Sequence, residues 1–329
     1  MPNTKKYPIS HSPFAIRHST FHISHFLFAI CYLLFACTNP VADTITPEGP
    51  PAFIDSQYAG HLVYVPSGSF EMGKDLGTAA TGDVAPVHTV NLTGFYMAIY
   101  PVTQAQYEAV MGTNPSYFKT ANGRAPAEGE TDAIRPVERV SWYDAIVFCN
   151  KLSMLEDLTP AYSIDGSTDP ADWGTIPTSS NETWNAVQMV AGSTGYRLPT
   201  EAQWEYAAKG GNGTPGNCTY SGSNDPEKIA WYDLNSGSRT HEVGKKLPNG
   251  LGIYDMSGNV WEYCWDRWGS YTSEEQTDPT GPTEESSCVI RGGCRLNEAV
   301  GLRTTYRNPG SLFAKGVHIG FRLVLPGGF

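Results

Sequence analysis

Residues 195–207, Gly195-Tyr-Arg-Leu-Pro-Thr-Glu-Ala-Gln-Trp-Glu-Tyr-Ala207, form the stretch that is most informative about the fold. Thr200 followed three positions later by Gln203 predicts a capping box, in which two side chains satisfy free backbone amides at the start of a helix. Trp204 and Ala207 are the expected buried positions of this helix, and Gly210-Gly211 is expected to end it. The stretch therefore predicts a short helix that is entered through a tight turn.

Two further helices are predicted upstream by the same kind of signal. Thr103 with Gln106 predicts the start of the first helix, and Gly112 predicts its end. Ser141 with Asp144 predicts the start of the second. One face of the second helix is apolar at helical spacing, so Cys149 is expected in the core. That face consists of Trp142, Ala145, Ile146, Cys149 and Leu152.

Short alternating segments predict strands on both sides of these helices. Residues 158–193, which contain Trp173 and Trp184, predict a surface β excursion rather than a second domain. The last two strand segments are expected to close a sheet. The strand segments are His61–Pro66, Ser69–Met72, His88–Ile99 (with Val90, Leu92, Phe95 and Met97 inward), Ser287–Arg291 and His318–Val324.

The composition favours one irregular α+β domain. The 329 residues are 40% hydrophobic and include 8 Trp, 18 Tyr and 13 Phe, which is enough apolar surface for a globular core. The 34 Gly and 24 Pro break the chain too often for long helices, so a turn-rich α+β domain fits better than a helical bundle. We expect this domain to occupy residues 59–329. The net charge of −11 makes nucleic acid an unlikely class of partner.

The first forty residues predict export. Phe26–Ala36 is an apolar run of eleven residues after a stretch with only positive charge, which is too short to span a bilayer but typical of a secretory signal. It ends at Leu34-Phe35-Ala36-Cys37, which resembles the site where lipoprotein signals are cleaved before an acylated cysteine. The alternative is a chance Cys in an ordinary signal peptide.

These segments predict a location and a domain order. Residues 1–37 are expected to be a lipoprotein signal peptide with Cys37 as the lipidated residue, and residues 38–58 a flexible, Pro-rich tether. The protein is then expected in the bacterial cell envelope, extracytoplasmic and held to a membrane by its lipid anchor.

Eight short motifs occur in an order that resembles the formylglycine-generating enzyme family, also called sulfatase-modifying factors. The resemblance covers about residues 60 to 325 and implies an irregular C-type-lectin-like α+β fold with few short helices and short antiparallel strands. The motifs are Phe70–Gly73, Tyr100–Thr103, Arg135–Val137, Ser141–Trp142, Gly195–Glu201, Gly258–Glu262, Arg291–Gly293 and Gly320–Leu323.

The resemblance implies oxidation of a sulfatase cysteine to Cα-formylglycine, with copper held by two thiolates. The positions that would carry those thiolates are Asn297 and Leu302 here, and Cys294 is the only Cys from Gly293 onward. Soft Cu(I) prefers sulfur ligands, so this departure argues against copper and against the oxidase activity. Cys294 is the one candidate catalytic thiol, and the alternative for it is a small buried residue.

The resemblance also implies a structural calcium ion in the segment Asp255–Glu262. Its ligands would be the side chains of Asp255 and Glu262 and the backbone carbonyls of Gly258 and Val260. Calcium prefers several oxygen ligands of this kind. The alternative is an ordinary turn with solvated carboxylates.

Two functions of different class follow. One is an active or degenerate oxidoreductase that acts on a cysteine of an exported client. The other, which we favour, is a binding module that recognises an exported protein client or a surface ligand through the segment Cys294–Val317. Planar, aromatic and multi-donor side chains are suited to such contacts, and the expected contacts are Arg295, Asn297, Arg303, Tyr306 and Arg307.

Other conspicuous residues are expected to be structural. His88 has no second His or carboxylate at metal spacing and is expected to be a satisfied strand or loop histidine. Arg197, Arg291 and Arg322 lie inside motifs, where a hydrogen-bonded structural role is expected.

Overall fold

The computed structural model describes residues 50–74, 84–211, 218–282 and 286–328. The predicted signal peptide with Cys37, and most of the predicted tether, lie outside these residues. Within the described ranges, no helix combines the length and apolar character that crossing a membrane requires.

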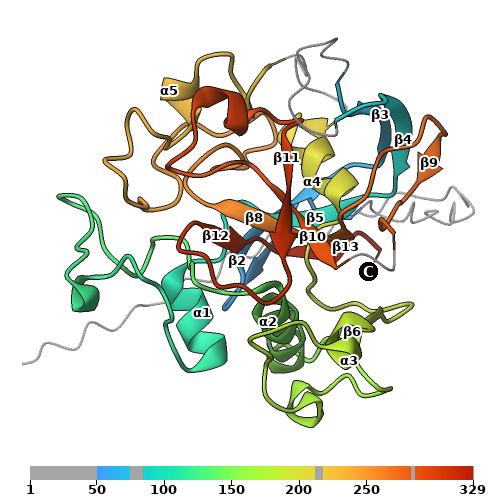
Figure 1. Ribbon diagram of the computed structural model, residues 1–329. Coiled ribbons are helices and arrows are strands. Elements are labelled where there is room, and N and C mark those ends of the chain that lie inside the picture. The colour runs from blue at the N-terminus through green and yellow to red at the C-terminus, as the bar shows by residue number, and fades with distance from the viewer. Residues whose placement is uncertain (1–49, 75–83, 212–217, 283–285, 329) are drawn as a thin grey trace, which may run out of the picture. The chain divides into compact units, whose positions relative to one another are not determined.

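The central sheet has the order β11-β10-β8-β12 and lies in the middle of Figure 1. β10 is antiparallel to both β11 and β8, whereas β12 runs parallel to β8. Almost every residue of β8 is buried, because the strand has neighbours on both sides. Our sequence analysis predicted β10 with its observed bounds but did not predict β8 or β11. The strands are β8 (Trp261–Arg267), β10 (Ser287–Arg291), β11 (Arg307–Ser311) and β12 (Ile319–Phe321).

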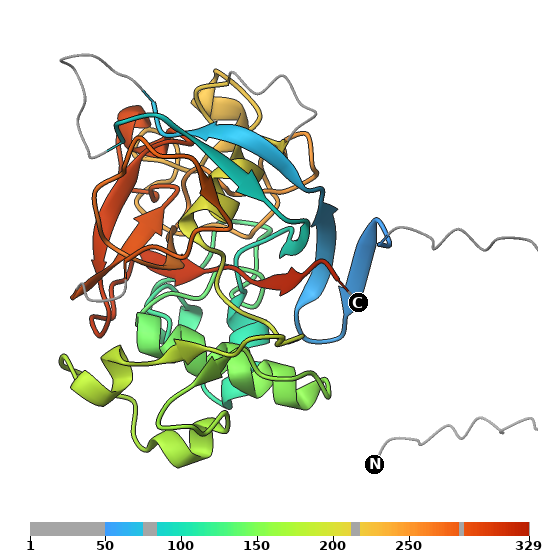
Figure 2. The same ribbon diagram turned by 90° about the vertical axis from the view of Figure 1, so that its right-hand side faces the viewer.

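A second sheet, β1-β2-β5-β13, joins the two ends of the domain. β1 (Phe53–Ser56) pairs antiparallel with β2 (Gly60–Val65), and β13 (Val324–Pro326) pairs antiparallel with β5 (Phe95–Ala98). Figure 2 shows β1 and the C-terminal end on the same side of the domain. The prediction of a flexible tether over residues 38–58 is therefore wrong at its C-terminal end. Residues 53–56 form a paired strand, so the domain begins before residue 59.

The segment predicted as one strand, His88–Ile99, forms two strands in different sheets. β4 (His88–Leu92) pairs with β3 (Gly68–Met72) and β9 (Gln276–Thr277), and β5 follows after a break at Thr93-Gly94. A Cβ at Gly94 would lie 2.1 Å from the Tyr64 hydroxyl oxygen, so a larger residue there would require the Tyr64 side chain to move. The four inward positions predicted in this segment are all buried. His318–Val324 is divided in the same way between β12 and β13.

The three predicted helices are present with their predicted caps. α1 (Gln104–Met111), α2 (Trp142–Leu155) and α4 (Glu201–Ala208) each begin at a complete capping box, and Gly112 ends α1. Cys149 is buried on α2 as predicted. The remaining helical turns are short: η2 (Thr120–Asn122), η3 (Pro170–Trp173), α3 (Glu182–Asn185), α5 (Pro226–Ile229) and η5 (Ala299–Leu302).

The segment 158–193 packs closely on α2 and is more than a surface excursion (Figure 2). It contains the predicted β structure as two short strands, β6 (Tyr162–Ser163) and β7 (Gln188–Met189). Trp173 and Trp184 are both buried, and their rings meet edge to face at 5.9 Å. These two Trp side chains join the main core, so the described part of the chain forms one mixed α+β domain with short elements.

Candidate functional site

Buried ion pairs connect α4 to the central sheet. Glu201 pairs with Arg307 of β11, and Glu205 pairs with both Arg291 of β10 and Lys209. Glu201, Glu205 and Arg291 are almost completely removed from solvent. A buried charge destabilises a fold unless a group of opposite charge pairs with it. The predicted structural role of Arg291 is thereby confirmed.

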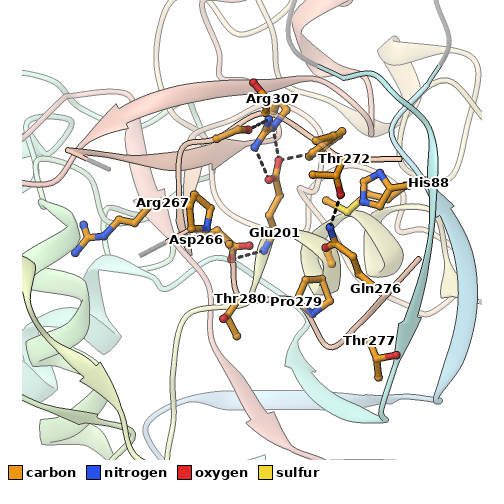
Figure 3. A pocket seen from close by; sticks show the side chains of 17 residues that line it. His88, Glu201, Asp266, Arg267, Thr272, Gln276, Thr277, Pro279, Thr280 and Arg307 are labelled. Atoms are coloured by element: carbon orange, nitrogen blue, oxygen red, sulfur yellow. Dashed lines mark hydrogen bonds and ion pairs between the residues drawn. The ribbon is translucent and has the colours of Figure 1, made fainter. Parts of the chain in front are cut away.

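The N-terminal turn of α4 borders a cavity of about 700 Å³ (Figure 3). The cavity lies between the end of β8 and the segment 269–282, which contains β9. Its floor carries the Glu201–Arg307 pair, and Tyr271 donates its hydroxyl hydrogen bond to Glu201 at 3.1 Å. Gly, Pro, Thr and Ser residues of the loop form much of the wall. The cavity thus has an ion pair, Glu201–Arg307, at its floor and both polar and apolar residues in its wall.

Asp266 of β8 also lines this cavity. Its Oδ2 accepts a hydrogen bond from the Glu201 backbone N–H at 2.8 Å. Burial and, to a smaller extent, the nearby Glu201 carboxylate raise the pKa of Asp266 to about 7, against the opposing effects of backbone hydrogen bonds and Arg307. Asp266 is the described carboxyl group of this cavity that can change its charge near neutral pH.

His88 lies on the opposite wall of the cavity and is structural, as predicted. Its Nδ1 lies 3.2 Å from the Pro86 carbonyl oxygen, and its ring meets that of Tyr271 edge to face at 5.0 Å. The side chain is buried.

Cys294 has the environment of a packed core residue. Only 3% of it is exposed, and it belongs to the main hydrophobic core beside Trp261. Burial raises the pKa of its thiol, which lowers the fraction of reactive thiolate. None of the five described cysteines forms a disulfide bond.

The positions that would carry a copper-binding thiol pair have other roles. Asn297 accepts a hydrogen bond from the Cys294 backbone N–H at 2.9 Å, and Leu302 is fully buried in a small apolar cluster. An amide and an aliphatic side chain do not fit Cu(I).

The predicted binding contacts of the segment Cys294–Val317 fall into two groups. Arg295 is corrected, because it is only 2% exposed and donates to the Ser238 and Val317 carbonyls while its guanidinium lies over Phe118. Arg307 is also buried, but it lines the large cavity. Three other residues are half-buried and so remain partly accessible, namely Asn297, Arg303 and Tyr306.

Exposed aliphatic side chains flank the same segment. Leu296 and Val300 are 52% and 45% exposed, and Leu234 is 78% exposed. The Asp233 N–H donates to the Asn297 carbonyl at 3.2 Å, which places the loop of Leu234 beside this segment. Our sequence analysis did not single out these residues, since isolated exposed Leu residues are common.

The two carboxylates predicted as calcium ligands, Asp255 and Glu262, have different partners. Glu262 accepts two hydrogen bonds from Arg322, each at 2.7 Å, which confirms the structural role predicted for Arg322. Asp255 is buried and accepts from the Gly244 N–H at 2.7 Å, yet it has no ion-pair partner among the described residues, and burial raises its pKa to about 6. An unpaired buried carboxylate fits a bound cation, so the donor set fits calcium, with Glu262 shared with Arg322.

The turn at Gly258 has the geometry that the Gly258–Glu262 motif requires. Gly258 has φ +85°, and a Cβ there would lie 2.3 Å from the Trp231 carbonyl oxygen. Only glycine fits both conditions. This turn carries the chain from Asp255 into β8 and so fixes the positions of Glu262 and Asp266.

The sequence analysis missed Glu201, Asp266 and Arg267 as residues of a cavity. Glu201 was recognised only as part of a motif at the start of a helix. Asp266 and Arg267 are adjacent charged residues within the Trp-rich run Trp261–Trp268, and this interruption of an apolar strand was the available signal.

Comparisons with known proteins agree with this architecture. A family described as "Sulfatase-modifying factor enzyme 1-like domain" matches residues 53–326. The chain is 40% identical over 276 residues to "Chaperone protein LppX" of Paenibacillus barcinonensis, covering 78% of this chain and 85% of that protein. It is 30% identical over 301 residues to the formylglycine-generating enzyme of Streptomyces coelicolor, covering 79% and 87%.

Among solved structures, Treponema denticola variable protein 1 superimposes with a TM-score of 0.76 and 36% identity, over 84% of this chain and 99% of that one. The mixed α+β fold with few helices and short strands is the predicted one. The chain belongs to the sulfatase-modifying factor enzyme 1-like family.

Proposed function

We propose that this protein is a non-catalytic binding protein of the cell envelope, which holds a segment of an exported protein client. The observation that carries this proposal is the state of Cys294. It is the one thiol after Gly293, it is buried, and burial raises its pKa. A thiol pair that could hold Cu(I) and activate oxygen is missing from this part of the chain.

The large cavity is the proposed binding site. Its volume of about 700 Å³ is in the usual range for ligand sites, and its wall combines Met72 and Tyr271 with Thr and Gln side chains. Arg307, one of the binding residues expected from the sequence, lies in its floor. A short extended segment of a client offers the mixture of apolar side chains and backbone polar groups that such a wall can accept.

The similarity to a protein named a chaperone supports a client of this kind. Export and anchoring through Cys37 complete the proposal, because the sequence Leu34–Cys37 resembles a lipoprotein cleavage site. Replacement of Cys37 by Ser is expected to release the protein from the membrane fraction.

Structural calcium at Asp255 is a separate proposal. The Asp255 side chain and the Gly258 and Val260 carbonyls would hold the ion, with Glu262 as a shared ligand. In this position the ion would neutralise the buried Asp255 carboxylate and stabilise the turn that leads into β8.

Catalysis is tested with purified protein loaded with copper and incubated aerobically with a Cys-x-Pro-x-Arg peptide. We expect mass spectrometry to show no aldehyde product, with a copper-loaded formylglycine-generating enzyme as the positive control. Aldehyde formation that Cys294→Ala abolishes would contradict the proposal and establish the oxidoreductase alternative.

Binding is tested by selecting short peptides on the immobilised protein and measuring their affinity for two variants. Ser270 is exposed and lines the cavity, whereas Ser273 is exposed outside its lining. We expect Ser270→Trp to weaken the selected peptides at least about tenfold and Ser273→Trp to leave them unchanged. Equal affinities for the two variants would exclude the cavity as the site.

A further inference from the structure

A second cavity, of about 480 Å³, lies on the other side of the wall formed by Thr280 and Pro282. Its lining comes from the segment 185–189, which joins α3 to β7, and from the end of β8. The apolar part of the lining is large for its volume and includes Trp265, Val187 and Met189. This cavity differs from the larger one because its one charged lining residue is a cation, Arg267.

The Arg267 guanidinium is located at the wall of this second cavity. Its NH2 group donates to the Asn185 carbonyl at 2.9 Å, and Asn185 is itself a lining residue. The Cζ atom lies 4.6 Å from the ring centroid of Trp142. In Figure 3 the Arg267 side chain extends away from the Glu201–Arg307 pair, so it is not directed to the floor of the larger cavity.

Arg267 is buried, and no charged side chain among the described residues forms an ion pair with it. It is 7% exposed, its NH1 group has no hydrogen-bond partner among the described residues, and none of the described ion pairs includes it. Burial lowers its pKa, and the opposing effects come from Cys288 and Tyr143 rather than from a carboxylate of the described residues. By contrast, the buried residues Arg291, Arg307 and Arg322 each pair with a Glu side chain.

An unpaired buried cation destabilises a fold unless an anion compensates it. Arginine is well suited to binding a carboxylate, because its planar guanidinium remains charged and donates hydrogen bonds in the plane of the carboxylate. Trp265, Val187, Met189 and Pro282 provide apolar surface beside the charge. The lining therefore matches a ligand with an anionic end and an apolar body.

We propose that this second cavity is a carboxylate-binding site, in which the Arg267 guanidinium pairs with the carboxylate and the apolar wall accepts an aliphatic or aromatic group. The shared chemistry fits the C-terminal residue of a peptide and also a small organic acid. The site is independent of the client-binding role proposed for the larger cavity, and either can fail without the other.

The test compares three probes of nearly the same shape on the purified protein by calorimetry or protein-observed NMR. N-acetyl-L-leucine carries the carboxylate, N-acetyl-L-leucinamide replaces it with a neutral amide, and 4-methylpentanoate keeps the carboxylate but lacks the acetamido group. We expect the amide to bind at least about tenfold more weakly than N-acetyl-L-leucine, which is the effect of losing one hydrogen bond to a charged group.

The third probe distinguishes the two sources of carboxylate. Weaker binding of 4-methylpentanoate identifies a peptide C-terminus, and equal binding identifies a free organic acid. Either result supports the site. Equal affinity of N-acetyl-L-leucine and its amide would overturn it, as would binding of none of the three.

Two variants locate the binding. Arg267→Gln is expected to remove the preference for the carboxylate, whereas Arg239→Gln, a change at an exposed arginine outside the lining, is expected to retain it. If Arg267→Gln does not fold, N-acetyl-photoleucine on the wild-type protein replaces it. Labelling of residues 185–189, Trp265 or Arg267 supports the site, and labelling confined to other segments overturns it.

Discussion

Glu201 of α4 and Arg307 of β11 form a two-point ion pair in the floor of the large cavity, with Nε···Oε1 at 2.7 Å and NH2···Oε2 at 2.6 Å. The two residues are 106 positions apart in the chain, and both are buried. The pair therefore determines how α4 sits against the central sheet.

Glu201→Gln is expected to destabilise the protein by about 3 to 5 kcal/mol, because Arg307 is left buried without its counter-charge. The free energy of unfolding from urea denaturation measures this. The double variant Glu201→Gln with Arg307→Met removes both charges and is expected to recover part of the loss. Equal losses in the single and double variants would contradict a dominant role for the uncompensated charge.

Asp266 is expected to make stability fall as the pH rises from about 4 to about 7. Its folded-state pKa, about 7, is above the unfolded value of 3.8, so in this window the unfolded chain is ionised while the folded protein keeps the proton. The raised pKa of Asp266 stabilises the folded protein by about 4 kcal/mol below pH 4, and this stabilisation is lost as the pH passes 7.

Asp266→Asn removes this titration and can still accept the hydrogen bond from the Glu201 N–H. We expect the variant to gain stability relative to the wild type as the pH rises to about 7, with a constant difference above it. Thermal unfolding across pH 4 to 8 gives this difference. A difference that does not change with pH would exclude a raised pKa at Asp266.

Calcium is expected to raise the melting temperature, and EGTA to lower it, if the ion occupies the proposed site at Asp255. Asp255→Asn should abolish the response, because the amide lacks the charge that the ion neutralises. Magnesium at the same concentration serves as the ionic control. A wild-type melting temperature that is the same in calcium and EGTA would rule out the calcium proposal.

Thiol reagents are expected to modify Cys218 before any other described cysteine. Cys218 is half-buried, whereas Cys149, Cys264, Cys288 and Cys294 are buried and burial raises the pKa of each. Timed iodoacetamide labelling with peptide mass spectrometry gives the order. Early modification of Cys294 in the folded protein would revive it as a reactive residue.

Local signals predicted the helices well because each capping box is complete within four residues. Thr103, Ser141 and Thr200 all start helices as expected. Strand limits were less accurate where one continuous pattern serves two sheets. The chain changes sheet after Leu92, where Gly94 lies against Tyr64 of another strand, and the local pattern does not reveal this tertiary contact.

The candidate sites could be predicted only in part for the same reason. The Gly258–Glu262 turn was identified from its motif, but the Arg322 partner of Glu262 comes from the far end of the domain. Arg295 was expected among the binding contacts because its guanidinium is a planar, multi-donor group, but tertiary packing buries it over Phe118. Arg267 attracts attention only once the structure shows that it is buried and forms no ion pair with a described residue.

The sheet β1-β2-β5-β13 has a consequence for the order of folding. Its two edge strands come from opposite ends of the domain, since β1 lies at residues 53–56 and β13 at residues 324–326. β5 therefore lacks one neighbour until the final residues of the domain have been delivered. Such distant pairing is slow and exposes an unpaired edge meanwhile. Under the export proposed above, the chain would have to be kept from pairing with other chains until its last strand has crossed the membrane.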